Sequence, residues 1–512
     1  MVESHILTEV SKNLPLRIGS PDQFQEVQNW LRKAGFETEI LCKTLNIPAL
    51  SELDSIKRDQ VQLGNVSTQL ALCIQIFLFG EVLPDAEADR VLSTDLREVL
   101  ISLDLLRPCD IGRKGYYSSA FLYPAAGFLM ASDRHTNPDS SPFVPPPDVV
   151  FPAIFPGTLR FLRMIPDSPA ARALDLCSGS GIGALVLSRR AQSAIASDIT
   201  SRATHFADFN RRLNGCANVE VAEGDLYAAV AGSTFDRIVG HPPYVPSLGD
   251  QMIFRDGGEA GETILRRMVE GLPQHLRPNG TFCALGIGHD TKEGRFEERV
   301  RNWLGDSKSQ FDIVFACADE KSPKQAVQDI AERAKSIESA RPERLLEVFN
   351  KIGTIKLAYG ALFIRRNARP TSSGWTARPR LSAATDGSSF EWLLSWRDRR
   401  AEPLFAQRVT SAMPRLAPDL RIKSTHVVHE GALVPAEFLL ETDKPFATVT
   451  RFDLWVIPVI AKFDGKRTVA EIHQAAATNG EVPENFALSD FVELVALLVE
   501  RGYLILEDQI VS

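Results

Sequence analysis

Two short stretches of the sequence carry residue types that suit chemistry on a bound ligand. The first is the glycine-rich stretch Asp175-Leu-Cys-Ser-Gly-Ser-Gly181, which lies between an expected strand and an expected helix. A turn of this kind directs backbone N–H groups and a helix N-terminus at a ligand, and glycines without Cβ atoms allow close approach. The second stretch is His241-Pro-Pro-Tyr244, which follows another expected strand. Its imidazole and phenol can hydrogen-bond a reacting group.

The glycine turn by itself fits more than one purpose. Gly179, Gly181 and Ala184 satisfy the dinucleotide fingerprint GxGxxG/A, so a nicotinamide cofactor is one interpretation. Tight packing without any ligand is another. Asp198, 19 residues after Gly179, ends the next expected strand, where a carboxylate can bind both hydroxyls of a ribose.

Two carboxylates favour S-adenosylmethionine over a dinucleotide. Asp175 lies directly before the turn, where it can orient the loop or bind the ammonium of a methionine moiety, and where it would repel a pyrophosphate. Asp225, in Glu223-Gly-Asp225 after the third expected strand, can accept a hydrogen bond from an adenine amino group. The predicted cofactor-binding residues are Asp175, Cys177, Gly179, Gly181, Asp198, Asp225, Leu226 and His241.

His241-Pro-Pro-Tyr244 resembles the (N/D)PP(Y/F) signature of methyltransferases that act on planar nitrogen. The flanking Phe235-Asp-Arg-Ile-Val-Gly240 and Phe254-Arg-Asp-Gly-Gly258 are similar to the release-factor glutamine methyltransferases, the HemK/PrmC group, over roughly residues 110 to 365. The resemblance implies a class I methyltransferase in which the tetrapeptide orients the acceptor and the aromatic residue stacks on it. His241, Pro242 and Tyr244 are then the predicted catalytic residues.

His241 departs from that signature, which has Asn or Asp at this position. A neutral imidazole accepts only one hydrogen and cannot reproduce the amide oxygen of Asn. It can act as a general base near neutral pH, which suits an acceptor other than a glutamine amide. The alternative is that His241 only fills the position while the carbonyl of Pro242 orients the acceptor. For Arg255 and Asp256, closure over the substrate and a structural pair are equally open.

The elements that position these residues alternate between strand and helix over residues 150–366. The expected strands cover 173–176, 194–198, 219–222, 235–240 and 281–285, with later strands at 311–317 and 356–364 and a charged helical insertion at 323–350. Such alternation indicates a parallel sheet with helices on both faces. The predicted fold class is therefore α/β, with a Rossmann-like methyltransferase domain.

Two further domains are expected on either side of it. Residues 1–140 have helical periodicity and form a mainly helical N-terminal domain, which ends in the Pro-rich loop 137–147. After a linker at 367–389, residues 390–512 form a small α+β winged-helix-like domain, with a capping box at Thr468 and Glu471. This domain resembles PqqD-type peptide-recognition domains, which would deliver a peptide or partner protein. A generic winged-helix packing module is the alternative.

The composition narrows the partners. The 512 residues carry a net charge of -8, which does not suit a general nucleic-acid binder, although arginines from Arg365 to Arg400 leave an RNA-contacting arm open. The 7 cysteines form no CxxC pair, no metal site is indicated, and no secretory or membrane-spanning segment is found, so we expect a cytoplasmic protein. We predict methyl transfer to an N or O nucleophile of a protein, peptide or peptide-derived substrate; an RNA or DNA amino-methyltransferase and a non-catalytic binding module remain alternatives.

Overall fold

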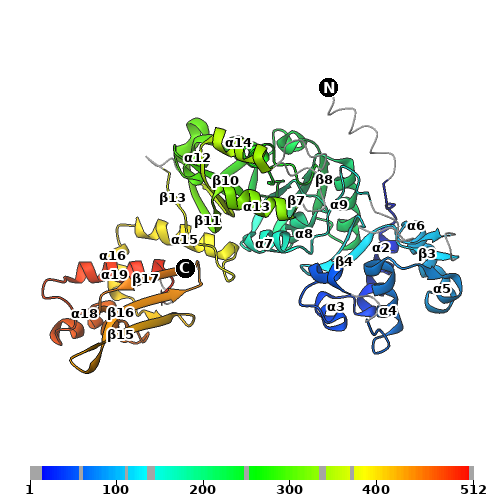
Figure 1. Ribbon diagram of the computed structural model, residues 1–512. Coiled ribbons are helices and arrows are strands. Elements are labelled where there is room, and N and C mark those ends of the chain that lie inside the picture. The colour runs from blue at the N-terminus through cyan, green and yellow to red at the C-terminus, as the bar shows by residue number, and fades with distance from the viewer. Residues whose placement is uncertain are drawn as a thin grey trace. The chain divides into compact units, whose positions relative to one another are not determined.

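The computed structural model describes residues 14–56, 61–109, 114–134, 144–246, 253–333, 342–368 and 374–506. The chain divides into two compact units, which are described separately (Figure 1). The first comprises Met1–Ile313 and Glu320–Thr376, and the second comprises Val314–Asp319 and Ala377–Ser512. No helix of the described residues is long and apolar enough to cross a membrane.

An eight-stranded sheet, in the order β13-β11-β12-β10-β9-β6-β7-β8, belongs to the first unit except for Val314–Asp319 of β11 and Ala377 of β13. Its strands are β6 (Ala170–Leu176), β7 (Ala191–Asp198), β8 (Val219–Glu223), β9 (Phe235–Gly240), β10 (Leu276–Thr291), β11 (Phe311–Lys321), β12 (Thr354–Arg366) and β13 (Thr376–Ala377). The strands β6 to β10 pair in parallel, and β12 runs antiparallel to β10. The predicted Rossmann-like sheet with an antiparallel late strand is therefore confirmed.

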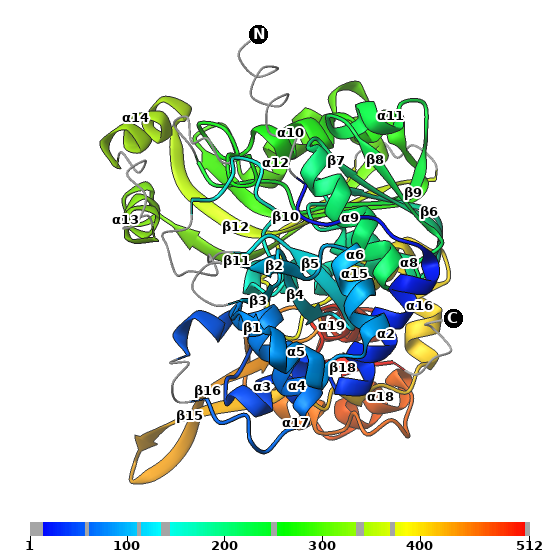
Figure 2. The ribbon, with the colours of Figure 1, turned by 90° about the vertical axis from the view of Figure 1, so that its right-hand side faces the viewer.

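Helices follow the strands and cover the sheet. They are α7 (Pro156–Met164), α8 (Ile182–Ser188), α9 (Ser201–Leu213), α10 (Thr263–Glu270), α11 (Leu272–His275), α12 (Phe296–Trp303), α13 (Pro323–Arg333) and α14 (Pro342–Ile352). In Figure 2, α10 and α12 lie above the sheet and α8 lies below it. The expected helix from Thr263 onward is interrupted at Gly271, and Pro273 sits in the first turn of α11, where its missing N–H costs no hydrogen bond.

The N-terminal part of the first unit combines helices with short strands. Its elements are α2 (Pro21–Ala34), α3 (Thr38–Leu45), α4 (Thr68–Cys73), a π-helical stretch (Ile74–Phe79), α5 (Asp85–Val91), α6 (Thr94–Ser102), β1 (Leu83–Pro84), β2 (Arg107–Cys109), β3 (Gly115–Tyr117), β4 (Phe121–Ala125) and β5 (Phe128–Ser132). These elements pack on α9: the rings of Phe24 and Phe209 meet edge to face at 5.1 Å, and Asn210 bonds both backbone groups of Ala131. Most of the expected loop at 137–147 lies outside the described residues.

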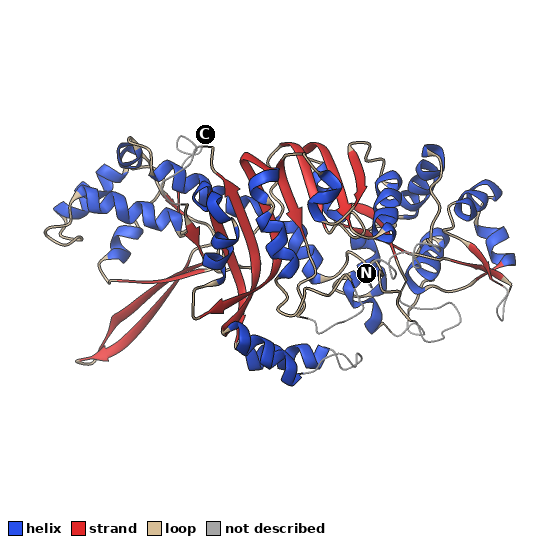
Figure 3. Ribbon diagram, turned by 90° about the horizontal axis from the view of Figure 1, so that it is seen from above, coloured by secondary structure: helices blue, strands red, loops and turns tan. Residues whose placement is uncertain are grey.

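The second unit has its own apolar core, and its helices and strands are coloured by type in Figure 3. Its helices are α15 (Gly387–Arg400), α16 (Phe405–Ser411), α17 (Val456–Ile460), α18 (Val469–Thr478) and α19 (Leu488–Glu500). Its strands are β14 (Arg415–Leu416) paired with β18 (Leu504–Ile505), and a three-stranded sheet of β15 (Arg421–His429), β16 (Ala432–Thr442) and β17 (Thr448–Phe452). The predicted capping box is present, since Thr468 Oγ1 accepts from Glu471 N at 3.2 Å.

Candidate functional site

The sheet topology brings the two sequence motifs to one edge. Leu176, the last residue of β6, pairs with Ser197 of β7 on one side and with Gly240 of β9 on the other. Because these strands are parallel, the segments that follow them all leave at the carboxyl edge. From β6, the strand order continues to β7 and β8 on one side and to β9 and β10 on the other. The carboxyl end of β6 is therefore a topological switch point, where sheets of this kind usually bind their ligands.

The glycine turn has the backbone that its sequence demands. Gly179 has φ 52° and Gly181 has φ 81°, and a Cβ on Gly181 would lie 2.9 Å from the Cβ of Ala207. A Cβ on Gly179 would have no atom within 4 Å, so that glycine faces open space. Cys177 also has a positive φ of 55°, an unfavourable conformation for a non-glycine residue that costs roughly 1–3 kcal/mol and tends to occur at functional sites.

Asp175 lies beneath the turn and holds it in place. Its carboxylate accepts a hydrogen bond of 2.9 Å from Ala184 N at the start of α8, and the side chain is 2% exposed. A Cβ on Gly183 would lie 2.5 Å from Asp175 Oδ2, so only glycine fits there. Burial raises the pKa of Asp175 to about 8. Of the two roles expected for Asp175, orienting the loop is the one these contacts support.

Asp198 joins the end of β7 to the glycine turn. Its Oδ2 accepts from Gly179 N at 2.9 Å, and its Oδ1 accepts from Thr200 N at 3.2 Å. Burial raises the pKa of this carboxyl group above its usual value. Each carboxylate oxygen has a second lone-pair direction, so these bonds leave capacity for the hydroxyls of a ribose.

Asp225 has a partner that the sequence did not suggest. Its Oδ2 accepts from Arg267 of α10 at 2.7 Å, and both side chains are nearly half exposed. The next residue, Leu226, is buried and has a positive φ of 50°. Cys177 and Leu226 were both predicted to contact the cofactor. Both have a positive φ, which is strained for a non-glycine residue, and both lie at the carboxyl edge of the sheet.

The residues at this edge fit a nucleoside cofactor with a methionine tail. The hydroxyl of Ser178 is buried without a hydrogen-bond partner among the described residues, which leaves a donor and acceptor for a ligand. Gly179 leaves room above the turn, and Asp198 stands 19 residues later at the end of the neighbouring strand. No cluster of three or more His, Cys, Asp or Glu suited to a metal occurs in the part of the chain that the structure describes.

His241 is held between two aromatic rings. Its ring stacks on Phe161 of α7 with centroids 5.3 Å apart and lies 5.7 Å from the ring of Tyr244. Its Nε2 is buried and has no hydrogen-bond partner among the described residues. Burial lowers the pKa of His241 to about 4, so the imidazole is neutral at physiological pH. A neutral ring with a free nitrogen suits hydrogen bonding to an acceptor group better than it suits strong base catalysis.

Two residues near Tyr244, namely Tyr359 and Arg160, were not predicted from the sequence. Tyr359 of β12 lies 5.7 Å from the ring of Tyr244, and the guanidinium of Arg160 in α7 lies 5.7 Å from the ring centroid of Tyr359. Burial raises the pKa of the Tyr359 hydroxyl above its usual value. No spacing rule connects these three segments, so only the folded arrangement shows them together.

A buried network holds the loop that carries Tyr244. Val245 N donates to Arg255 O at 3.3 Å, and Gly257 N donates to Val245 O at 3.0 Å. At the end of this loop, Glu262 receives two hydrogen bonds of 2.8 Å from Arg299. Glu262 is 6% exposed, so this ion pair is largely buried.

His289 and Asp256 both make hydrogen bonds that hold the backbone near this loop. His289 is fully buried and bonds Thr354 Oγ1 and Ala260 O, so it packs behind the loop. Asp256 caps its own turn by accepting from Gly258 N at 2.8 Å. No ion pair joins Arg255 to Asp256, both of which the structure describes, so the structural-pair interpretation gains no support.

Three of the arginines between Arg365 and Arg400 are engaged within the protein. Arg365 pairs with Asp312, Arg366 donates to the carbonyls of Pro273 and Leu276, and Arg400 pairs with Glu493 and Glu500. These contacts favour structural roles over an RNA-contacting arm. Arg369 lies outside the described residues.

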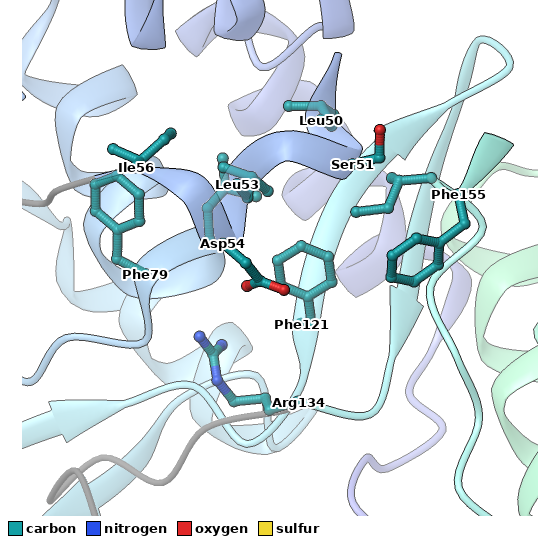
Figure 4. A pocket seen from close by; sticks show the side chains of 11 residues that line it. Leu50, Ser51, Leu53, Asp54, Ile56, Phe79, Phe121, Arg134 and Phe155 are labelled. Atoms are coloured by element: carbon teal, nitrogen blue, oxygen red, sulfur yellow. The ribbon is translucent and has the colours of Figure 1, made fainter. Parts of the chain in front are cut away.

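A separate pocket of about 130 Å³ lies in the N-terminal part of the first unit (Figure 4). Asp54, Phe121 and Arg134 are among its lining residues, and Arg134 donates to the carbonyls of Ile76, Phe77 and Ala120. Phe155, which precedes α7, also lines it. The pocket does not include the glycine turn or His241.

The sheet order, the glycine turn and the tetrapeptide at the switch point are the arrangement expected of a class I methyltransferase domain. Residues 153–303 match the family model of the methyltransferase small domain. This match confirms the predicted methyltransferase domain and S-adenosylmethionine as its cofactor.

The relatives are protein methyltransferases. The chain is 31% identical over 168 residues to the ribosomal protein uL3 glutamine methyltransferase of Bradyrhizobium diazoefficiens, which covers 30% of this chain and 53% of that protein. It is also 31% identical over 182 residues to the release factor glutamine methyltransferase of Xylella fastidiosa, covering 33% of this chain and 59% of that protein. The chain thus spans little more than half the length of these relatives. The resemblance to the HemK/PrmC group is confirmed for this domain.

Among solved structures, the chain is similar to ribosomal protein L11 methylase from Lactobacillus delbrueckii subsp. bulgaricus. The two share 20% identity, with 41% of this chain and 77% of the other covered, at a TM-score of 0.25. At this TM-score the likeness gives no support for the fold beyond the sheet order itself.

Proposed function

We propose that the chain is an S-adenosylmethionine-dependent methyltransferase that methylates an N or O nucleophile of a protein, peptide or peptide-derived substrate. The supporting observation is the placement of His241-Pro-Pro-Tyr244 one strand away from the glycine turn, at the same edge of the sheet. The relatives named as methyltransferases of a ribosomal protein and a release factor support a protein acceptor. A cytoplasmic location is part of the same proposal.

The residues divide into cofactor and acceptor roles. Gly179, Gly181 and Asp198 would hold the cofactor, whose sulfonium supplies the methyl group. His241 Nε2 accepts the hydrogen of the acceptor N–H or O–H, and Tyr244 stacks on the acceptor group. Bound there, the cofactor would supply its methyl group to the acceptor atom that His241 and Tyr244 hold, and the acceptor proton would leave to solvent. Positioning and exclusion of water carry most of the rate.

A labelling experiment tests this function. Purified protein and S-adenosylmethionine with a labelled methyl group are added to a lysate, half of which is treated with nuclease. Nuclease-resistant, protease-sensitive label, located by mass spectrometry, is the expected result. Label lost with nuclease would favour a nucleic-acid acceptor, and no S-adenosylmethionine binding in calorimetry would reject the proposal.

We further propose that the second unit delivers the substrate, as the winged-helix-like and PqqD-like interpretation implies. Its support is β17, which ends the three-stranded sheet, so that its outer edge has no further named strand among the described residues. An extended segment can add to such an edge. Val449, 61% exposed on β17, provides the test. Val449→Asp is expected to raise KM for the protein acceptor and to leave KM for S-adenosylmethionine unchanged.

A further inference from the structure

The hairpin of β15 and β16 is exposed to an unusual degree. All nine residues of β15, Arg421–His429, are exposed, and Figure 2 shows the tip of the hairpin extending beyond the helices of its unit. The third strand, β17, pairs only with Phe438–Thr442 at the base of the hairpin. The outer half is therefore an isolated two-stranded ribbon, which is at best marginally stable in water.

The ribbon carries an apolar face that continues from the core. Ile422 pairs with Leu440, which is fully buried in the core of the unit, and Val428 pairs with Leu433 further out. Positions 422, 424, 426 and 428 of β15 share one face because side chains alternate along a strand. At the tip this face is bare, with Val428 74% and Leu433 72% exposed.

Charged side chains give β15 little of the protection that an edge strand usually has, although the pairing of β15 with β16 shifts register between Thr425 and His426. Positive side chains normally discourage pairing with another strand. Here Arg421 bonds Asp443 at 2.9 Å, and Lys423 bonds Glu441 at 2.8 Å, so both charges are engaged by the hairpin's own residues. The sequence of β15 contains no proline, and no strand pairs with its outer edge among the described residues.

The pattern of β15 is complementary to itself. In an antiparallel pair centred on Thr425, residue i faces residue 850 − i of the second copy, because the two numbers sum to twice 425. Ile422 then lies opposite Val428, Ser424 opposite His426, and Lys423 opposite Val427. Apolar side chains meet on the face that is bare at the tip, and no two Lys or Arg residues lie opposite each other.

We propose that β15 pairs with β15 of a second copy of this chain, forming a two-fold symmetric dimer through a continuous six-stranded sheet. Such an interface is isologous, since each copy offers the same strand. It gives the isolated ribbon neighbouring strands and places Val428 of each copy beside Ile422 of the other. This inference does not depend on the proposed catalytic function.

The test measures the mass of the full-length protein in solution. Light scattering after gel filtration is expected to give twice the 56.5 kDa of one chain. The variant Ile422→Lys/Val428→Lys places Lys opposite Lys twice and should weaken the dimer by about tenfold or more. The variant Ile422→Lys/Val428→Glu places Lys opposite Glu at both positions and should remain dimeric. Leu433→Lys, on the same face but off the pairing edge, is the matched control and should also remain dimeric.

Each outcome decides the question. A monomeric wild-type chain, or a Lys/Lys variant that stays dimeric, overturns the proposal. A Lys/Glu variant that is monomeric while Leu433→Lys is dimeric overturns the register. A wild-type monomer that carries a bound peptide in native mass spectrometry shows that an extended segment occupies the edge instead. Unchanged circular dichroism of the variants confirms that they fold, because the substituted side chains are exposed.

Discussion

The ring of His241 stacks on the ring of Phe161, with centroids 5.3 Å apart and an interplanar angle of 20°. Phe161 is 2% exposed and belongs to α7, which precedes the first strand of the parallel sheet. The stack fixes the plane of the imidazole, and the burial that it provides lowers the pKa of His241 to about 4. The residue that replaces the expected Asn or Asp is therefore a fixed, neutral hydrogen-bonding group.

His241 should act by orientation, and its pH dependence tests this. Because its pKa lies near 4, the neutral ring predominates from pH 6 to 9, so titration of His241 should not change the rate of methyl transfer over that range. His241→Ala should lose activity on the labelled acceptor and keep S-adenosylmethionine binding, whereas His241→Asn should retain activity. A rate that rises between pH 6 and 7 and is lost in His241→Asn would show that a general base is required.

Asp175 should make folding depend on pH. Its folded-state pKa of about 8 exceeds the ordinary value of 3.8, so the folded protein keeps a proton that the unfolded chain releases. Stability should therefore fall as pH rises from 4 to 8, by on the order of 3 kcal/mol between pH 5 and 8. Urea unfolding at the two pH values measures this loss.

The variant Asp175→Asn separates the pH dependence of stability that Asp175 causes from that caused by other titratable groups. The Asn side-chain oxygen can still accept from Ala184 N, but it does not titrate. The variant should lose most of the pH dependence, while Asp22→Asn, at an exposed position of α2, should keep it. An unchanged slope in Asp175→Asn would assign the pH dependence to other groups.

Gly179 and Gly181 should fail in different ways when replaced by alanine. Gly181→Ala places a Cβ 2.9 Å from Ala207 at φ 81° and should cost about 2 kcal/mol of stability or more. Gly179→Ala meets no atom within 4 Å at φ 52° and should cost only about 1 kcal/mol. Its methyl group points into the open space where we propose that the cofactor binds, so affinity for S-adenosylmethionine should fall about tenfold or more. Calorimetry and thermal unfolding separate the two effects, and equal affinity in Gly179→Ala and wild type would remove this glycine from the binding site.

The parallel sheet and both motifs could be predicted because local patterns encode them. Alternating strand and helix segments give the topology, and topology alone brings the segments after β6, β7 and β9 to one edge. Gly179 and Gly181 predict a turn at this position because few other residues tolerate a positive φ. The position of Asp225 after β8 was predictable, but its ion pair with Arg267 was not, since 42 residues separate them.

The rest of the site depends on packing between distant segments. Arg160, Phe161 and Tyr359 surround His241 and Tyr244, yet nothing in their local sequence distinguishes them from ordinary helix and strand residues. The same holds for the pKa of His241, which depends on how completely its neighbours exclude water. A sequence shows that the residue can titrate, but only the fold shows how far burial shifts the titration.

Glu262 should be essential for the loop that follows Tyr244. Its carboxylate takes two hydrogen bonds from Arg299 and one of 2.7 Å from His289 N, at a site only 6% exposed. Glu262→Gln leaves the Arg299 charge without a counter-ion and should cost about 3 kcal/mol or more. Glu270→Gln, which breaks an exposed pair with Arg266, is the matched control and should cost less than about 0.5 kcal/mol.

Hydrogen exchange shows where the stability lost in Glu262→Gln acts. Val245 N donates to Arg255 O, and Gly257 N donates to Val245 O. If the variant loosens this loop, these two amides should exchange faster before the amides of the sheet do. Faster exchange at these two amides, with β6 and β9 unchanged, is the expected pattern. Exchange that rises equally throughout the first unit would mean that Glu262 stabilises the whole unit and has no special role in holding the loop beside Tyr244.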